Sequence, residues 1–305
     1  MFAAVKSRFL PAVQLMRLPL VITAVSNTQA AMVLSNTHNH RDWTPVAALA
    51  LLAMSAGLYS FGMVANDIVD LKRDRYLAPH RPLAAGRIGL QAAHLLAVAL
   101  LLIGTIGGMV YAMICGGGLI SAFFLVWTIV LIFFYNGMGK FVGAVGLLTL
   151  GLIRFFHAAV AQPHLSIVWH PLLLMDHVCI LSAICYVLEG KRPRLSRGHW
   201  WTTGIILAAL NVFFATGIAL ATWWKLRDDQ NLMEAMGVTS SLLWPAIAVV
   251  VFAAFTAGTL LPLRQQQEMS NRQLFDRQRS TGRRLMVFGL VWLVIYDLAF
   301  VYGYF

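Results

Sequence analysis

Long apolar runs recur along the whole chain and limit what it can fold into. Most are close to 20 residues long with few charges, which is the length a helix needs to cross a hydrocarbon layer of about 30 Å. Membrane strands would be segments of about ten residues with alternating polarity, which the runs do not resemble. With 59% hydrophobic residues in 305, the chain carries more apolar surface than a soluble core of that length buries. The sequence therefore predicts an all-α, multi-pass membrane helical bundle.

We expect about nine transmembrane helices in one domain that covers residues 1–305. Their approximate bounds are 18–36, 45–65, 90–112, 118–135, 141–162, 170–188, 200–224, 241–263 and 284–304. Because nine is an odd number, the two termini are expected on opposite sides of the membrane.

The placement of the basic residues decides between a membrane topology and a nucleic-acid partner. The formal net charge is +11, but nineteen of the 23 Lys and Arg residues precede the first span or follow an even-numbered one. Positively charged loops gather on the cytoplasmic side of membrane proteins. We therefore expect the N-terminus and the basic loops in the cytoplasm, a location in the bacterial inner membrane, and no nucleic-acid partner. The oligomeric state stays open.

Three carboxylates follow the second apolar run, in the segment VANDIVDLKRDR at residues 64–75. Asp67, Asp70 and Asp74 are three and four residues apart, so on a helix they share one face with neighbours about 5–6 Å apart. Like charges at that spacing repel one another, whereas Mg²⁺ binds carboxylate oxygens and leaves room for substrate phosphates. The spacing indicates a metal-bridged diphosphate site. The alternative is a solvated helix end whose acids pair with the basic residues of the same segment.

The residues after these acids favour the metal site. NDIVDLKRD followed by RPLAAGRI, within residues 66–88, resembles the first aspartate-rich motif, NDxxDxxxD followed by RPxxxG, of the UbiA superfamily of intramembrane prenyltransferases. The nine-span topology resembles that family in outline. Residues 16–31 and 134–158 are similar to its first, fourth and fifth spans, including Arg17, Asn27, Tyr135, Lys140 and Arg154.

The second acidic motif of that family is reduced in this chain. Most members carry further aspartates after the sixth span, which hold a second Mg²⁺, but the matching segment CYVLEGKRPRLSR at 185–197 has one acid, Glu189. Either the cationic loop binds phosphate oxygens directly, as Lys and Arg do elsewhere, or the site serves a different or non-catalytic role. The single Glu followed by Gly is most similar to the EboC-like branch.

The resemblance implies Mg²⁺-dependent transfer of a prenyl group from a prenyl diphosphate to an unidentified acceptor within the membrane. The expected catalytic residues are Asn66, Asp67, Asp70, Asp74 and Glu189, and the four carboxylates among them are the expected Mg²⁺ ligands. Substrate contacts are expected from Arg17, Asn27, Arg73, Tyr135, Lys140, Arg154, Lys191 and Arg192. An aromatic chamber for the prenyl cation could be lined by Phe133, Phe134, Tyr135, Phe155 and Phe156.

Two alternatives remain open. A terpene cyclase of the same superfamily would quench the cation within its own chain and would need no acceptor. A non-catalytic binding or transport component would keep the acidic helix to hold an isoprenoid phosphate lipid. Asp176, Asp297, Arg154 and His157 also fall within or near apolar spans, where ionisable groups are costly. We interpret the two aspartates as structural and Arg154 as a contact to diphosphate or acceptor.

Overall fold

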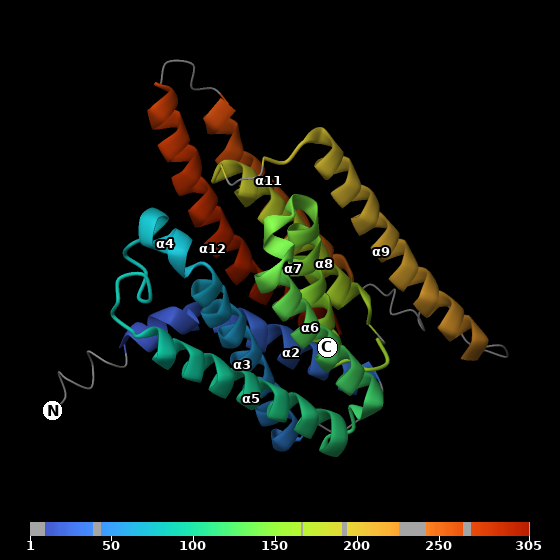
Figure 1. Ribbon diagram of the computed structural model, residues 1–305. Helices are drawn as coiled ribbons and strands as arrows, with labels where there is room; N and C mark the ends of the chain where they lie inside the picture. Colours follow the sequence, from blue (N-terminus) through green and yellow to red (C-terminus); the bar gives the residue numbers. More distant parts are fainter. Residues whose placement is uncertain are drawn as a thin grey trace.

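The computed structural model describes residues 10–38, 44–165, 167–190, 194–225, 242–264 and 270–304, and within these ranges its regular elements are helical. Figure 1 shows the helices as a bundle. In chain order they are α2 (Leu18–His38), α3 (Pro45–Val69), α4 (Leu71–Leu77), α5 (Leu90–Ile114), α6 (Gly118–Gly137), the short 3-10 helix η1 (Gly139–Phe141), α7 (Gly143–Ala159), α8 (Trp169–Leu188), α9 (Arg197–Lys225), α11 (Leu243–Arg264) and α12 (Asn271–Tyr304). The all-α fold class is confirmed.

A helix lies at each of the nine expected spans, although one of them is short. Among the described residues, eight helices are long and apolar enough to cross a membrane, namely α2, α3, α5, α6, α8, α9, α11 and α12. The fifth expected span corresponds to α7, which has 17 residues and is about 25 Å long at 1.5 Å per residue. It begins later than expected because η1 and Val142 interrupt the helix after α6.

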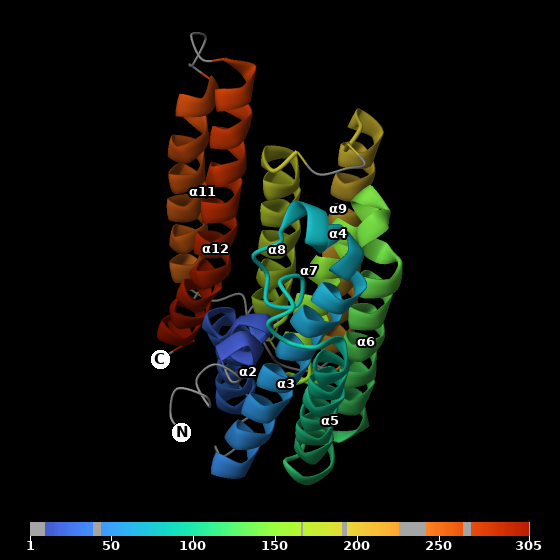
Figure 2. The ribbon, with the colours of Figure 1, turned by 60° about the vertical axis from the view of Figure 1, so that its left-hand side comes forward.

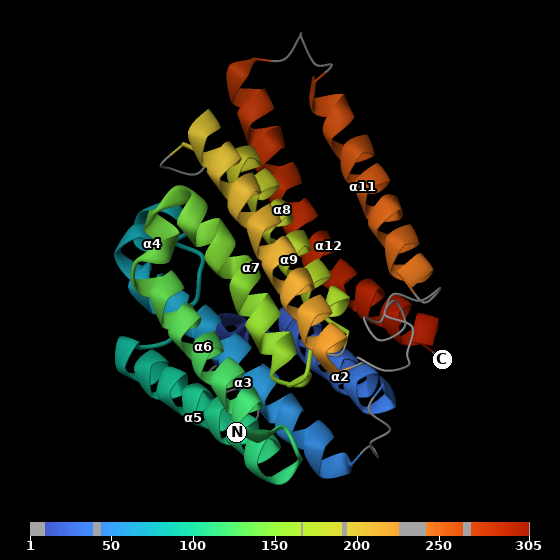
Figure 3. The ribbon, with the colours of Figure 1, turned by 90° about the vertical axis from the view of Figure 1, so that its right-hand side faces the viewer.

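Small residues hold α3 and α5 close together. A Cβ atom added to Gly57 of α3 would lie 2.5 Å from the backbone nitrogen of Gly104 on α5, and one added to Gly107 would lie 2.7 Å from the carbonyl oxygen of Ala50. Backbones in a membrane approach this closely only where side chains are absent or very small. Figure 2 shows the two helices side by side, with α11 and α12 as a pair on another flank of the bundle. Figure 3 shows α9 across α7 and α8.

The acidic segment spans a junction between two helices. Asp67 belongs to α3, Asp70 ends α3 and precedes α4, and Asp74 lies in α4. The amide of Asp70 donates to the carbonyl of Asn66, and the amide of Asp74 donates to that of Asp70. These bonds keep the helical spacing across the junction, so the three side chains still share one face.

The loop between α4 and α5 folds back toward this junction. Gly86 has a φ of 67°, a conformation that glycine adopts without a steric cost. The amide of Arg87 donates to the carbonyl of Pro82, which closes the turn, and Leu83 is buried beneath it. This fold returns Arg81 to the acidic residues.

Candidate functional site

The three carboxylates of the acidic segment are buried. Asp67, Asp70 and Asp74 expose 4%, 4% and 3% of their surface. The structure therefore contradicts the alternative of a solvated helix end. Because a buried carboxylate needs a nearby cation or strong hydrogen bonds to remain charged, the groups that face these acids determine what the site can do.

Two arginines from distant parts of the chain neutralise Asp67 and Asp74. Nη2 of Arg17, which precedes α2, lies 3.2 Å from Oδ1 of Asp67. Nη1 of Arg81 lies 3.4 Å from the same oxygen and also contacts Oδ2 of Asp74. One guanidinium nitrogen thus lies between two carboxylates.

Asp70 has a separate pair of cations. Nη2 of Arg73 lies 2.8 Å from Oδ2 of Asp70, and Nζ of Lys140 lies 2.9 Å from Oδ1. Lys140 also donates to Oδ1 of Asn66, at 3.1 Å. The start of α2, the α3–α4 junction, the following loop and η1 therefore meet at one place, which we call the acidic site and define by Asn66, Asp67, Asp70 and Asp74.

The acidic site has the donor chemistry of a magnesium site. Its ligands would be three carboxylates and one amide oxygen, the hard oxygen donors that Mg²⁺ prefers. Among the described residues, no group of three or more His, Cys, Asp or Glu side chains lies close enough to hold a metal ion in the present arrangement. Arg81 lies between the carboxylates of Asp67 and Asp74, and Lys140 lies between the carboxylate of Asp70 and the amide oxygen of Asn66, so a metal ion would have to replace these side chains there.

The remaining residues expected at the site lie at different places. Tyr135 lies near the C-terminal end of α6, five residues before Lys140 of η1. Glu189 follows α8 and packs against Gly282 of α12, where an added Cβ would lie 3.3 Å from Cγ of the glutamate. Lys191 and Arg192 lie outside the described residues.

Arg154 and Asn27 belong to a second polar cluster, inside the bundle. Nη1 of Arg154 donates to Oδ1 of Asn27 at 3.0 Å, and Nη2 donates to Thr23 at 3.2 Å. The amide nitrogen of Asn27 in turn donates to Oδ2 of Asp297 at 2.9 Å. Asn27 thus links a buried guanidinium to a buried carboxylate.

The partners that hold Asp297 are not evident from the spacing of residues in the sequence. Ser26 donates to Oδ2 of Asp297 at 2.6 Å, and Nε2 of His170 lies 2.8 Å from Oδ1. With Asn27, this carboxylate has three polar partners and connects α2, α8 and α12. The available signal was the occurrence of His170 and Asp297 in apolar segments, where ionisable groups need partners.

The expected aromatic chamber is wrong in part. Phe133 and Phe134 expose 53% and 39% of their surface on the outside of α6 and cannot line an internal chamber. Phe155 is fully buried, but its ring stacks on Phe214 of α9 with centroids 4.1 Å apart. Adjacent residues on a helix point in different directions, so a run of aromatic residues cannot all face one cavity.

Comparison with known proteins finds partial sequence matches to two archaeal synthases. No family model matches the chain. Digeranylgeranylglyceryl phosphate synthase of Sulfolobus acidocaldarius is 35% identical over 104 residues, which are 34% of this chain and 35% of that protein. The synthase of the same name from Ignicoccus hospitalis is 31% identical over 101 residues, 33% of this chain and 31% of that protein. The matched segment spans about a third of the length of these relatives.

Solved structures match over nearly the whole chain. One, from a study of digeranylgeranylglyceryl phosphate synthase in membranes, has a TM-score of 0.59 at 17% identity and covers 97% of this chain and 98% of its own. A UbiA homologue from Archaeoglobus fulgidus bound to GPP and Mg²⁺ has a TM-score of 0.52 at 13% identity, covering 93% and 99%. The chain therefore shares its fold with these proteins, one of them a UbiA homologue, over nearly its whole length.

Proposed function

We propose that the chain is a prenyltransferase of the UbiA superfamily. The fold that it shares with a UbiA homologue supports this proposal, as does its sequence match to a digeranylgeranylglyceryl phosphate synthase over a third of its length. The reaction transfers a prenyl group from a prenyl diphosphate to an acceptor in the membrane. The observation that carries this proposal is that three buried carboxylates contact four cationic side chains at one end of the bundle.

Each residue of the acidic site has a role in this proposal. Asp67, Asp70 and Asp74 with Asn66 would hold Mg²⁺, and Glu189 would supply one further carboxylate. Bound Mg²⁺ would neutralise the negative charge of a diphosphate leaving group. The cations Arg17, Arg73, Arg81 and Lys140 are then free to contact phosphate oxygens, which guanidinium and ammonium groups bind well.

The position of the acidic site in the bundle supports a proposal for the side of the membrane that it faces. The acidic site and the end of α8 lie toward the same end of the bundle, as Figure 2 shows for α4 and α8. Basic loops gather at this end in the sequence, so we place it in the cytoplasm and the protein in the bacterial inner membrane. A water-soluble diphosphate headgroup would thus reach the site from the cytosol.

The proposal is tested by measuring diphosphate release. The purified protein in lipid nanodiscs is incubated with radiolabelled geranylgeranyl diphosphate, MgCl₂ and geranylgeranylglyceryl phosphate, an acceptor that the name of the relatives' product suggests. Asp67→Ala and Asp70→Ala should reduce release by at least about 100-fold, since each removes a charge from the leaving-group site. Asp276→Ala, at an exposed position on α12, is the matched control and should retain full activity. Undiminished release in both acidic-site variants would remove these residues from the reaction.

The reduced second motif favours one other function, that of a non-catalytic component which holds an isoprenoid phosphate lipid. Glu189 is the only acid in residues 185–197, so a second metal ion would have fewer protein ligands. Mg²⁺-dependent binding of geranylgeranyl diphosphate without release of diphosphate would support this function. Release without any added acceptor, together with a cyclic product, would instead indicate a terpene cyclase.

A further inference from the structure

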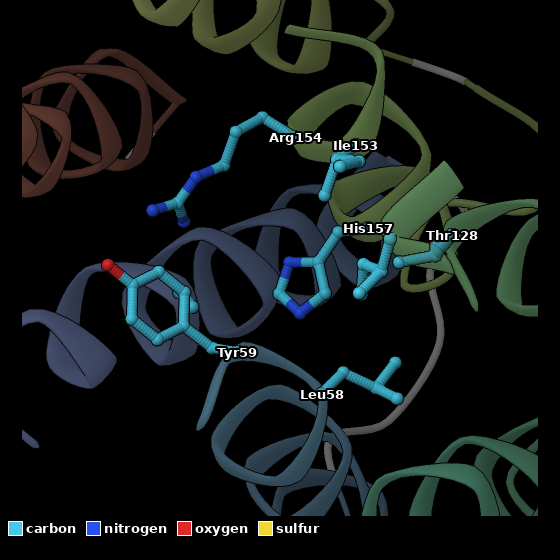
Figure 4. A pocket seen from close by; sticks show the side chains of 8 residues that line it. Leu58, Tyr59, Thr128, Ile153, Arg154 and His157 are labelled. Atoms are coloured by element: carbon cyan, nitrogen blue, oxygen red, sulfur yellow. The ribbon is translucent and has the colours of Figure 1, made fainter. Parts of the chain in front are cut away.

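His157 on α7 is a buried histidine without a hydrogen-bond partner. The side chain exposes 5% of its surface, and neither Nδ1 nor Nε2 has a partner among the described residues. It lines a cavity of about 30 Å³ together with Leu58 and Tyr59 of α3. Figure 4 shows the imidazole projecting from α7 toward these two residues, with the guanidinium of Arg154 near the tyrosine hydroxyl.

Another buried histidine, His177, has hydrogen-bond partners for both of its ring nitrogens. Nδ1 of His177 lies 3.1 Å from the hydroxyl of Tyr296, and its Nε2 lies 2.8 Å from the carbonyl oxygen of Gly289. A buried polar group without a partner costs free energy, and such groups are uncommon in native proteins. The two free nitrogens of His157 therefore need a partner that enters the cavity.

The cavity lies beneath the acidic site. Tyr59 precedes Asn66 by seven residues, so on α3 the two side chains share a face. The separation along the helix axis is about 10 Å at 1.5 Å per residue. A molecule that binds the acidic site with one polar group could therefore extend far enough to place a second group in the cavity.

The side chains that line the cavity favour a ligand group with an uncharged oxygen, such as a hydroxyl group. A neutral imidazole offers one donor and one acceptor, which matches a hydroxyl group. A cationic ligand would be repelled by Arg154, whose guanidinium carbon lies 5.2 Å from the ring centre of Tyr59. Arg154 does not require an anionic ligand in the cavity to balance its charge, because Asn27 connects it to the carboxylate of Asp297.

The remaining lining and the size of the cavity define what carries this oxygen. Ala24, Leu58, Ile132 and Ile153 are apolar, and the hydroxyl group of Thr128 donates to the carbonyl oxygen of Phe124 on its own helix. A space of about 30 Å³ admits one or two groups of the size of a water molecule, and it is too small for a phosphate or a ring. Two sources of such an oxygen exist, a water molecule and the hydroxyl group of an apolar molecule.

We propose that His157 and the surrounding cavity form a subsite for the hydroxyl group of a lipid-like alcohol, which is the acceptor if the proposed prenyl transfer is correct. The hydroxyl displaces water from the cavity and exchanges hydrogen bonds with the imidazole. For the group that enters the cavity, His157 thereby selects a hydroxyl group over a carboxylate, an amine or a hydrocarbon end.

The test uses four probes that share one chain: 1-hexadecanol, hexadecane, hexadecanoic acid and hexadecylamine. The thermal unfolding midpoint of the full chain in nanodiscs is measured with each probe. Only 1-hexadecanol should raise the midpoint. The rise should be about 3 °C if the dissociation constant lies well below the added concentration of the alcohol. His157→Phe should abolish this rise, and His157→Gln should retain part of it because the amide also donates and accepts.

The matched control is the other buried histidine. His177→Phe should lower the midpoint of the ligand-free protein because it removes two hydrogen bonds, whereas His157→Phe should leave it unchanged or raise it. Equal shifts with alcohol and alkane would mean that the cavity does not recognise the hydroxyl group, and a shift that survives in His157→Phe would place the alcohol elsewhere. A loss of stability in His157→Phe as large as in His177→Phe would make the role structural. Each of these results would overturn the subsite.

The experiment separates this subsite from the proposed reaction. Asp67→Ala should lose diphosphate release while it keeps the stabilisation by 1-hexadecanol. If wild-type protein releases no diphosphate but is stabilised by the alcohol, the reaction is wrong and the subsite holds. The reverse result would reject the subsite alone.

Discussion

Nζ of Lys140 lies 2.9 Å from Oδ1 of Asp70, and the two side chains expose only 7% and 4% of their surface. Lys140 comes from η1, whereas Asp70 lies at the α3–α4 junction, so the pair joins two distant parts of the chain. A buried ion pair of this kind is costly to break, because the partner that remains is a charge without compensation. The pair therefore connects the stability of the bundle with the electrostatics of the acidic site.

Replacing Lys140 with Met should lower the stability of the metal-free protein. The methionine keeps the length of the side chain but removes its charge, leaving Asp70 with Arg73, whose own side chain is 55% exposed. We expect a loss of about 1–3 kcal/mol, measured by thermal unfolding without divalent cations. Added MgCl₂ should restore part of it by supplying positive charge. Lys72→Met, at an exposed neighbouring position, serves as the control, and equal midpoints for the two variants would contradict the prediction.

Replacing Arg81 with Ala should make the protein more sensitive to Mg²⁺. Its guanidinium nitrogen lies between Asp67 and Asp74, so it competes with a divalent ion for the same oxygens. The concentration of MgCl₂ that gives half of the maximal thermal stabilisation should fall about tenfold, equivalent to about 1.4 kcal/mol. Turnover should nevertheless decrease, because a cation for the diphosphate is lost.

The neighbouring arginine provides the control for this experiment. Arg75→Ala removes an exposed positive charge from α4 and should leave the MgCl₂ titration unchanged. If Arg81→Ala needed more MgCl₂ than the wild type, the guanidinium would not be competing with the metal at these oxygens.

The sequence predicted the helices because apolar length is a local property. The spacing of Asp67, Asp70 and Asp74 likewise predicted a shared face, and their i to i+4 hydrogen bonds preserve it. The cations that neutralise the site are harder to predict from the sequence. Arg81 stands out in the sequence only as the first residue of RPLAAGRI, since the position of its guanidinium depends on how the loop around Gly86 folds back. Such a contact is a property of the tertiary structure.

The buried cluster around Asp297 shows the same limitation more strongly. Its members come from residues 23–27, 154, 170 and 297, and no spacing rule connects positions on four different helices. What the sequence could indicate was the need for partners, because each ionisable group lies in an apolar segment. Which partners meet is decided by the packing of α2, α7, α8 and α12.

Removing the carboxylate of Asp297 should destabilise the bundle strongly. Asp297→Leu leaves Ser26, Asn27 and His170 without their shared acceptor and leaves the charge of Arg154 without its balance. We expect a loss of about 3–5 kcal/mol for Asp297→Leu and less for Asp297→Asn, which keeps one acceptor oxygen. Equilibrium unfolding in mixed micelles would measure both.

A second aspartate with fewer partners gives the comparison. Oδ1 of Asp176 accepts one hydrogen bond from Asn211, at 2.8 Å. Asp176→Asn should therefore cost less than Asp297→Asn. If the two variants lost the same stability, the three donors around Asp297 would not act as a cooperative cluster.

Adding a single methyl group at Gly57 should disturb both the packing and the acidic site. The new Cβ would lie 2.5 Å from the backbone nitrogen of Gly104, so α3 and α5 would have to separate, at a cost of about 1–3 kcal/mol. Gly62→Ala on the same helix is the control, because its Cβ would meet Ile132 at an ordinary 3.6 Å. Since α3 carries Asp67 and the loop with Arg81 leads into α5, separation of the two helices should also lengthen the Asp67–Arg81 contact. Gly57→Ala should thus lose diphosphate release at temperatures where it is still folded, and equal activity of the two alanine variants would show that the position of α5 does not affect the site.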